Sequence, residues 1–217
     1  MTTLVPGIPS DVAASDVMRV IAHELRQPLS TIGSIAYYLT LILPRDDEKV
    51  HEQLSRLQQL VEQSSWILTN GQHLTDEPED VAPKQIDIEE IIARAISARS
   101  GAGDVPLLLE LAGDLPQVQA DPALARALIE NLLTLFRLVS SAQHPTTLRT
   151  RTANSGASIE IATTAVGYRS EAMLGPGSTL GLECARRIVE RHGGTLDLNV
   201  DPATGVRMIV VLPSTEF

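Results

Sequence analysis

The sequence of 217 residues is poor in cysteine and in aromatic side chains. It has one cysteine, Cys184, which excludes an internal disulfide framework and fits a reducing compartment. Aromatic residues make up 3% of the chain, too few to supply the stacking platforms on which single-stranded nucleic acids bind. Because Cys184 lies in an apolar helical pattern, we expect it to be buried and unreactive.

Long apolar runs and an excess of positive charge are also missing. No run has the length of a transmembrane helix and no basic-then-apolar leader is present, so we expect a cytoplasmic protein with no membrane partner. The formal net charge is -10 at pH 7, which argues against nucleic acid as the main partner. Four histidines have no metal-ligand spacing, so no metal site is expected: His51, His73, His144 and His192.

What the sequence does contain is a chemically suggestive heptapeptide, His-Glu-Leu-Arg-Gln-Pro-Leu, at residues 23–29. It lies within an amphipathic helical pattern. Apolar residues at steps of three and four predict one buried stripe on this helix: Met18, Ile21, Leu25, Pro28, Ile32, Ile35, Leu39 and Ile42. His23 is offset from this stripe, so we expect it on the opposite, solvated face. A lone histidine usually carries no chemistry, but Glu24 and Pro28 beside it favour a reactive one.

The heptapeptide resembles the H-box, the phospho-accepting motif in the dimerisation and histidine-phosphotransfer domain of sensor histidine kinases. Every fixed position of the family pattern His-(Glu/Asp)-Leu-Arg-x-Pro-Leu is met. The resemblance implies three catalytic residues: His23, whose Nε2 accepts the phosphoryl group, Glu24, which orients the ring through its other nitrogen, and Gln27, which contacts the transferring group or a hydrolytic water. A neutral imidazole is a competent nucleophile near pH 7.

Residues 15–75 have a helical pattern throughout, apart from a break at residues 44–47. The second helix carries a heptad seam: Val50, Leu54, Leu57, Val61, Ser64, Leu68 and Gly71. Two helices and a short loop predict an antiparallel hairpin, and one hairpin cannot cover both apolar faces. We therefore predict an all-α hairpin that forms a dimeric four-helix bundle with a second copy. The alternative is that the stripe packs on the rest of the chain.

The remainder of the chain follows a different pattern. Residues 1–14 are interpreted as an N-terminal tail and residues 76–84 as a polar linker, and strands and helices then alternate over residues 85–217. The predicted helices cover residues 89–99, 121–141 and 179–192. The predicted strands cover residues 86–88, 107–111, 117–119, 148–152, 158–163, 195–200 and 206–212. Elements in this order predict an α/β sandwich.

This second segment resembles the catalytic, ATP-binding domain of the same family. The match rests on Gly-Ser-Thr-Leu-Gly-Leu at residues 177–182 and His-Gly-Gly at residues 192–194, against the family's Gly-x-Gly-Leu-Gly-Leu and His-Gly-Gly. The resemblance implies an α/β sandwich of the histidine-kinase ATPase type, and together with the H-box it covers nearly the whole chain. Phosphate binding by Gly177, Gly181 and the following helix N-terminus remains physically possible.

The N-box and the adenine-binding motif depart from the family. Residues 131–136 are Asn-Leu-Leu-Thr-Leu-Phe, so Leu135 stands where the family's second asparagine binds magnesium. An aliphatic side chain offers no oxygen to a hard cation. Thr163 replaces the aspartate that binds the adenine amine, and Ala165 replaces a glycine of the same motif.

Two further departures concern the glycine-rich loop and the lid over the nucleotide. Thr179 stands where the family has another glycine. The segment between Gly167 and Gly177 is too short for a long ATP lid. With the two motif losses, these departures indicate a fold retained without its nucleotide chemistry.

We therefore predict a degenerate-kinase histidine phosphotransferase that works as a homodimeric relay. His23 would accept phosphoryl from an aspartate on one response-regulator receiver domain and pass it to another without ATP. No cofactor is expected to bind at the vestigial nucleotide positions, since the receiver would bring its own magnesium: Asn131, Gly167, Gly177 and Gly181. A hybrid histidine kinase is a further candidate partner.

Two alternatives stay open. The chain could be an ATP-dependent sensor histidine kinase with divergent nucleotide motifs, including a piece of a longer sensor. It could also be a non-catalytic module whose helical dimer binds a receiver or a kinase and blocks it. The sequence names neither the donor, the acceptor nor the stimulus.

Overall fold

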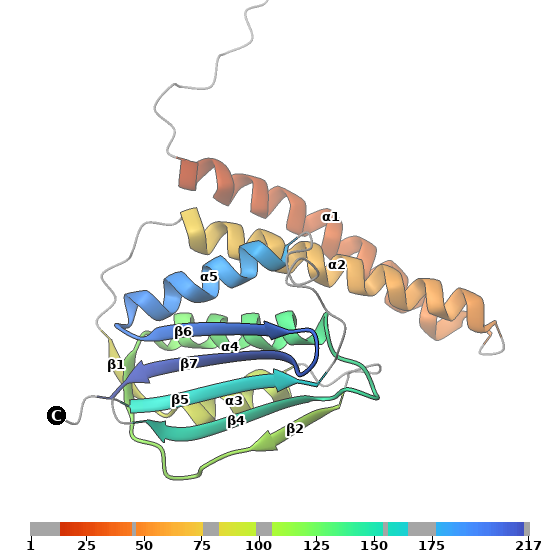
Figure 1. The fold of residues 1–217 in the computed structure, drawn as a ribbon. Helices are drawn as coiled ribbons and strands as arrows, with labels where there is room; N and C mark the ends of the chain where they lie inside the picture. The colour runs from red at the N-terminus through yellow and green to blue at the C-terminus, as the bar shows by residue number, and fades with distance from the viewer. Residues whose placement is uncertain are drawn as a thin grey trace, which may run out of the picture. The chain divides into compact units, whose positions relative to one another are not determined.

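The computed structural model describes most of the chain as two compact units, with the boundary between residues 78 and 79. The first unit holds helices α1 and α2, and the second holds all the other elements (Figure 1). The described residues are 14–44, 47–75, 83–98, 106–153, 156–164 and 177–214. The predicted tail up to residue 13 and the predicted linker up to residue 82 therefore lie outside the described residues.

The first unit is the predicted helical hairpin, made of α1 (Ala14–Ile42) and α2 (Glu48–Thr75). The two helices meet through small side chains. Ala22 and Ala36 of α1 are fully buried. Gly71 of α2 lies against Met18, so closely that a Cβ on Gly71 would come within 2.4 Å of the methionine Cε. Small residues thus let the two helix backbones approach each other.

The apolar stripe predicted to be buried on α1 is largely exposed in this hairpin. Five of its residues are 40% to 55% exposed: Ile21, Leu25, Ile32, Ile35 and Ile42. This exposure fits the expectation that one hairpin cannot cover both apolar faces, because periodicity identifies an apolar face but does not say what covers it. The face that meets α2 is the one with alanine and glycine, and the larger apolar side chains lie beside it.

The second unit is the predicted α/β sandwich. Its main sheet has the order β2-β4-β5-β7-β6, in which β2 pairs parallel to β4 and all other neighbours are antiparallel. The strands are β2 (Leu107–Glu110), β4 (Thr146–Ala153), β5 (Gly156–Thr163), β6 (Thr195–Asp201) and β7 (Gly205–Pro213). A small separate sheet pairs β1 (Lys84–Ile86) with β3 (Val118–Ala120).

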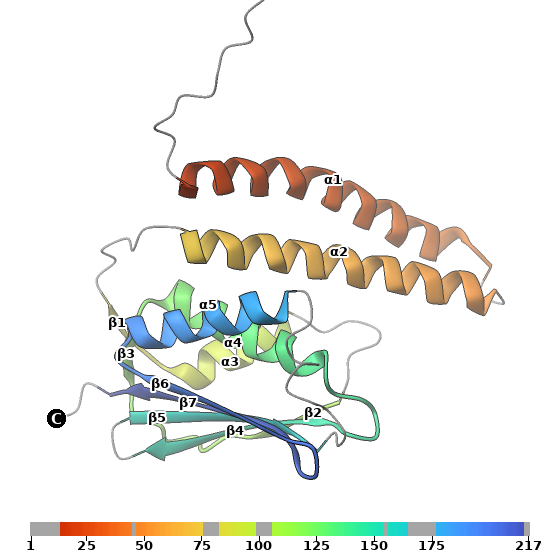
Figure 2. The ribbon, with the colours of Figure 1, turned by 45° about the horizontal axis from the view of Figure 1, so that its top comes forward.

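Three helices cover one face of the main sheet, as Figure 2 shows. They are α3 (Ile88–Ser97), α4 (Pro122–Arg137) and α5 (Ser178–Arg191). Asp87 and Asp121 cap α3 and α4, and each carboxylate accepts two backbone N–H groups of the first turn. Helix α4 ends four residues before its predicted end, because Ser141 and His144 exchange backbone hydrogen bonds in a turn that leads into β4.

The core of the second unit lies between these helices and the sheet. Helix α4 supplies much of it, and nine of its residues are buried, including Leu132, Leu135 and Phe136. Ile159 and Ile161 of β5 are fully buried on the sheet side. The position and packing of α4 therefore decide what its side chains can bind.

Candidate functional site

His23 lies on the exposed face of α1, as predicted, with 69% of its side chain accessible. Its Nδ1 is 3.3 Å from Oε1 of Glu24, whose side chain is equally exposed. With Nδ1 directed at a carboxylate, Nε2 has no hydrogen-bond partner among the described residues. This arrangement holds the ring through one nitrogen and presents the other to an incoming group.

Gln27 is also exposed, about one helical turn after His23. Pro28 follows it inside α1 without ending the helix. Because proline has no N–H, it cannot donate to the carbonyl of Glu24 four residues earlier. The three predicted catalytic residues therefore share one exposed stretch of α1.

Sequence reasoning missed the fourth residue of the heptapeptide, Arg26. Its side chain is half-buried, and Nη2 donates to Oγ1 of Thr69 at 3.2 Å and to Oε1 of Gln72. Both acceptors belong to α2. The only signal was its position three residues from His23, which suits a solvent-facing arginine equally well, so the partner could not be found from the sequence.

The N-box positions are occupied by groups that already have partners or lie in the core. Leu135, in the place of the magnesium-binding asparagine, is 1% exposed. Asn131 is 2% exposed and hydrogen-bonds the thiol of Cys184 on α5. Burial raises the pKa of that thiol to about 11, while the Asn131 contact lowers it by a smaller amount. The retained first asparagine of the N-box, Asn131, thus joins two helices.

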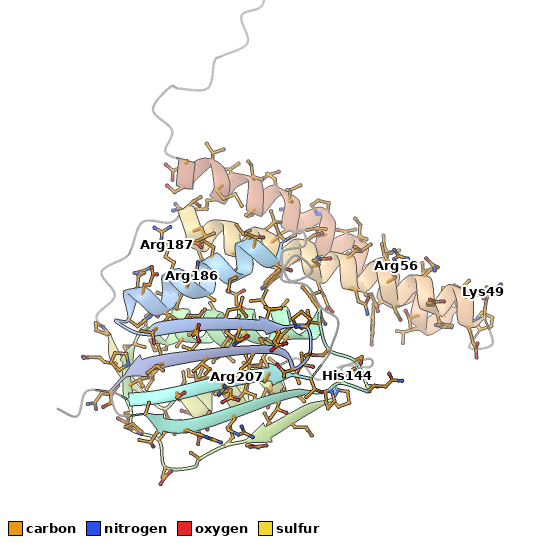
Figure 3. The ribbon with its side chains drawn as sticks, viewed as in Figure 1. Lys49, Arg56, His144, Arg186, Arg187 and Arg207 are labelled. Atoms are coloured by element: carbon orange, nitrogen blue, oxygen red, sulfur yellow. The ribbon has the colours of Figure 1, made fainter. Side chains whose placement is uncertain are left out.

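Thr163 ends β5 in the place of the adenine-binding aspartate. It is 4% exposed, and its Oγ1 donates to the carbonyl of His144 at 3.1 Å. His144, labelled in Figure 3, also places Nδ1 3.4 Å from Oγ1 of Thr164. A hydroxyl that gives its proton to a carbonyl is not a carboxylate acceptor for an adenine amine. Leu135 and Thr163 therefore do not fit the ligand set for magnesium and ATP that the family pattern requires.

The glycine-rich turn before α5 keeps the backbone geometry that glycine allows. Gly177 is the N-cap of α5 with φ of 89°, and no side chain caps this helix end. Gly181 is buried in the first turns of α5, and Thr179 is exposed. Gly167 and Ala165 lie outside the described residues. The open N–H groups of this helix end could meet an anion.

His192 of the His-Gly-Gly segment has a structural role. It is the C-cap of α5, and its Nδ1 donates to the carbonyl of Ile188 at 2.7 Å. Its Nε2 accepts the backbone N–H of Asp121 at 3.1 Å. The ring therefore connects the end of α5 to the start of α4.

Within the described ranges, no group of three or more His, Cys, Asp or Glu side chains could hold a metal ion. No described helix is long and apolar enough to cross a membrane.

Comparisons with known proteins match both units at once. No family model matches the chain. The sensor histidine kinase ZraS of Escherichia coli O157:H7 is 26% identical over 217 residues, which covers 93% of this chain and 46% of ZraS. The sensory histidine kinase/phosphatase NtrB of Salmonella typhimurium strain LT2 is 26% identical over 88% of this chain and 60% of NtrB. Over nearly its whole length the chain is therefore similar to two-component sensor histidine kinases.

Solved structures of histidine kinases share the fold. The Mycobacterial sensor histidine kinase MprB has a TM-score of 0.51 and 24% identity over 61% of this chain and 97% of its own. ShkA, crystallised with AMPPNP, has a TM-score of 0.62 and 17% identity over 92% of this chain and 46% of its own. The Acinetobacter baumannii histidine kinase AdeS has a TM-score of 0.54 and 16% identity over 89% of this chain and 98% of its own.

These matches also bear on the predicted function. The chain spans about half the length of the curated relatives it matches. Those relatives are named sensor histidine kinases, which favours the ATP-dependent alternative over the ATP-independent phosphotransferase prediction. Leu135 and Thr163, at the nucleotide positions, favour the ATP-independent phosphotransferase instead. An experiment that distinguishes the two phosphoryl sources is described below.

Proposed function

We propose that this histidine kinase-type chain acts in two-component signalling by carrying a phosphoryl group on His23. The observation that supports the proposal most strongly is the geometry of the H-box. The imidazole is exposed, its Nδ1 lies against the Glu24 carboxylate, and its Nε2 has no partner among the described residues. A phosphorylated partner can therefore reach the nucleophilic nitrogen directly.

The chemical step needs only an oriented imidazole. The Nε2 lone pair attacks the phosphorus of an acyl phosphate on a receiver aspartate, so a P–N bond forms while the P–O bond to the aspartate breaks. The bond's electrons leave with the aspartate as a carboxylate. Nδ1 keeps its proton, and the carboxylate of Glu24 offsets the positive charge that develops on the ring. Transfer to a second aspartate is the reverse of this step.

ATP is the phosphoryl source that the comparisons favour, since the matched relatives ZraS and NtrB are named as kinases. On this proposal the chain is an ATP-dependent histidine kinase with divergent nucleotide motifs. The uncapped N-terminus of α5 at Gly177 supports it, because open backbone N–H groups suit a phosphate.

A receiver aspartyl phosphate is our second candidate source, and Leu135 is the specific observation that favours it. Leu135 belongs to the buried core and offers no oxygen to magnesium, and Thr163 gives its proton to a backbone carbonyl. On this proposal the chain is an ATP-independent phosphotransferase with no cofactor, and magnesium comes with the receiver.

We also propose that the chain works as a homodimer in the cytoplasm with receiver domains as partners. The exposed apolar stripe of α1 supports dimerisation, because Ile21, Ile32 and Ile35 lose water contact only if another surface covers them. A second hairpin would complete a four-helix bundle around this stripe.

One labelling experiment tests the proposal and separates the two sources. The chain is incubated with γ-labelled ATP and magnesium, and in parallel with labelled phosphorylated receiver domains, and acid-labile label on the chain is counted. Either label should vanish in His23→Ala and in His23→Gln, because an amide cannot form the phosphoramidate. Label from ATP supports the kinase, and label from receivers alone supports the relay.

Undiminished label on His23→Ala would remove His23 from the mechanism. No label from any source would leave a non-catalytic binding module as the better explanation. Glu24→Gln should slow transfer without weakening receiver binding, since the amide can sit beside the ring but cannot offset its charge. Gln27→Ala should change the rate or the lifetime of the phosphohistidine.

A further inference from the structure

Arg26, within the H-box heptapeptide, makes a polar connection between α1 and α2. Its Nη2 donates to Oγ1 of Thr69 and to Oε1 of Gln72, and both acceptors are themselves half-buried. Both acceptors are neutral, and no carboxylate among the described residues pairs with Arg26. One guanidinium thus spans two side chains that are about one turn apart on α2.

Around Arg26, helix α1 contributes only small side chains to the buried contact with α2. Ala22 and Ala36 are the buried residues of α1. The buried apolar side chains of α2 are Leu54 and Leu68. Small side chains permit a close approach, but they form shallow ridges and grooves, which are what normally fix the angle of one helix against another. A directional contact such as that of Arg26 therefore has more influence on helix rotation than it would in an interface of large side chains.

We propose that Arg26 is a positioning residue that fixes the rotation of α1, and with it the direction in which His23 and Glu24 point. Arg26 and His23 are three residues apart and belong to adjacent turns of one rigid helix. A rotation of about 20° at a side-chain radius of about 5.5 Å would displace the His23 ring by roughly 2 Å. Displacements of about 1 Å in a reacting group can cost on the order of a hundredfold in rate.

This inference rests on the proposed phosphoryl transfer, so the test uses substitutions that never touch the donor. The double variant Thr69→Val, Gln72→Leu removes both acceptors from α2 and leaves α1 unchanged. It should lower the rate constant for labelling His23 roughly 10- to 100-fold, with little change in the donor concentration at half-maximal rate. Arg26→Met, which keeps the aliphatic stem, should have the same effect.

Two further variants serve as controls. Arg26→Lys should recover only part of the rate, because an ammonium is a point donor and cannot span both acceptors as a guanidinium does. Arg56, exposed on α2 (Figure 3), provides the matched control, and Arg56→Met should label at the wild-type rate. The donor is whichever of labelled ATP with magnesium or phosphorylated receiver labels the wild-type chain, and all variants are assayed well below their unfolding temperatures.

A second measurement follows rotation without any phosphoryl donor. Ala22→Cys places a thiol at a fully buried position of the α1–α2 contact. N-ethylmaleimide should react with it slowly in the parent chain and several-fold faster when Thr69→Val and Gln72→Leu are added. The natural Cys184 is buried with a raised pKa, so its background reaction is slow.

The outcomes separate the inference from the proposed function. If Arg26→Met is slow but the α2 double variant transfers at the wild-type rate, Arg26 acts on the donor and the positioning role is wrong. Wild-type rates in both variants would overturn it as well. If the wild-type chain takes no label, the proposed function fails, and the maleimide rates alone decide whether Arg26 holds α1 in place.

Discussion

The helical hairpin leaves many of its large apolar side chains exposed, whereas the α/β unit buries most of its own. Among the described residues of the hairpin, four apolar side chains are buried, namely Ala22, Ala36, Leu54 and Leu68. The α/β unit buries most of its large apolar side chains, including nearly one whole face of α4. The hairpin keeps every fixed position of the H-box pattern. In the α/β unit, Leu135 belongs to the buried core and Thr163 donates to a backbone carbonyl.

The two units therefore differ in whether they bury their own apolar side chains and in whether they keep a family motif. The α/β unit encloses its own core, and Leu135 and Thr163 are buried within it. The hairpin is complete as a chemical motif but leaves apolar surface exposed. We infer that the hairpin depends on a partner surface for its stability and that the α/β unit does not.

Matched isoleucine truncations should show the largest difference between the units. Ile159→Ala, at a fully buried position of β5, should lower the free energy of unfolding by about 2–5 kcal/mol. Ile35→Ala, at a position 54% exposed in the hairpin, should cost less, and its cost should grow with protein concentration if a second copy covers it. Denaturant unfolding at several protein concentrations measures both. A concentration-independent cost at Ile35 would contradict coverage by a second copy.

If the chain is an ATP-independent phosphotransferase, Leu135→Asn should destabilise the α/β unit without producing nucleotide binding. Leu135→Asn buries an amide in an apolar site, which should cost about 1–3 kcal/mol. Calorimetry with ATP and magnesium should detect no binding, because Thr163 and the other departures remain. Thr163→Asp should also destabilise the unit, since a carboxylate cannot donate to the His144 carbonyl. It should not produce ATP binding either, because Leu135 remains. Magnesium-dependent binding by the wild-type chain would support the ATP-dependent kinase instead.

A charge in the hairpin seam should act on association and leave the α/β unit intact. Leu57 is 37% exposed in the single hairpin, so Leu57→Asp is tolerable there but would be buried in a four-helix bundle. We expect the variant to be monomeric at micromolar concentration by light scattering, and the wild type to be dimeric. A monomeric wild type would rule out the proposed homodimer.

The smallest effect should be a pH dependence that belongs to the α/β unit alone. Because burial raises the pKa of Cys184 to about 11, the folded state holds its proton more tightly than the unfolded state, whose thiol titrates near 8.5. The stabilisation is therefore full below about pH 8.5 and is lost as the pH rises toward 11. Unfolding curves of wild type and Cys184→Ala should diverge less as pH rises over this range.

Much of this contrast could be predicted from the sequence. The helical periodicity gave the hairpin, and the alternation of strands and helices gave the α/β sandwich. Apolar runs and cap residues such as Asp121 predicted the ends of most elements to within a few residues. The exposure of His23 followed from its offset from the apolar stripe.

Contacts between distant residues could not be predicted in this way. The stripe containing Ile32 was expected to be buried, but the small residues beside it make the contact with α2. Arg26 gave no sign of its partners Thr69 and Gln72, which lie more than 40 residues away. Periodicity reports which face is apolar, whereas pairing depends on side-chain shape in three dimensions.

The His-Gly-Gly segment has a structural role that does not depend on nucleotide chemistry. His192 closes α5 and receives the N–H of Asp121, the residue that starts α4, so replacing it would loosen two helix ends at once. Selection for a stable domain alone would preserve this histidine in a descendant that had stopped hydrolysing or binding nucleotide. The presence of His192 therefore reflects its role in joining α4 and α5, and by itself it is no evidence that the chain uses ATP.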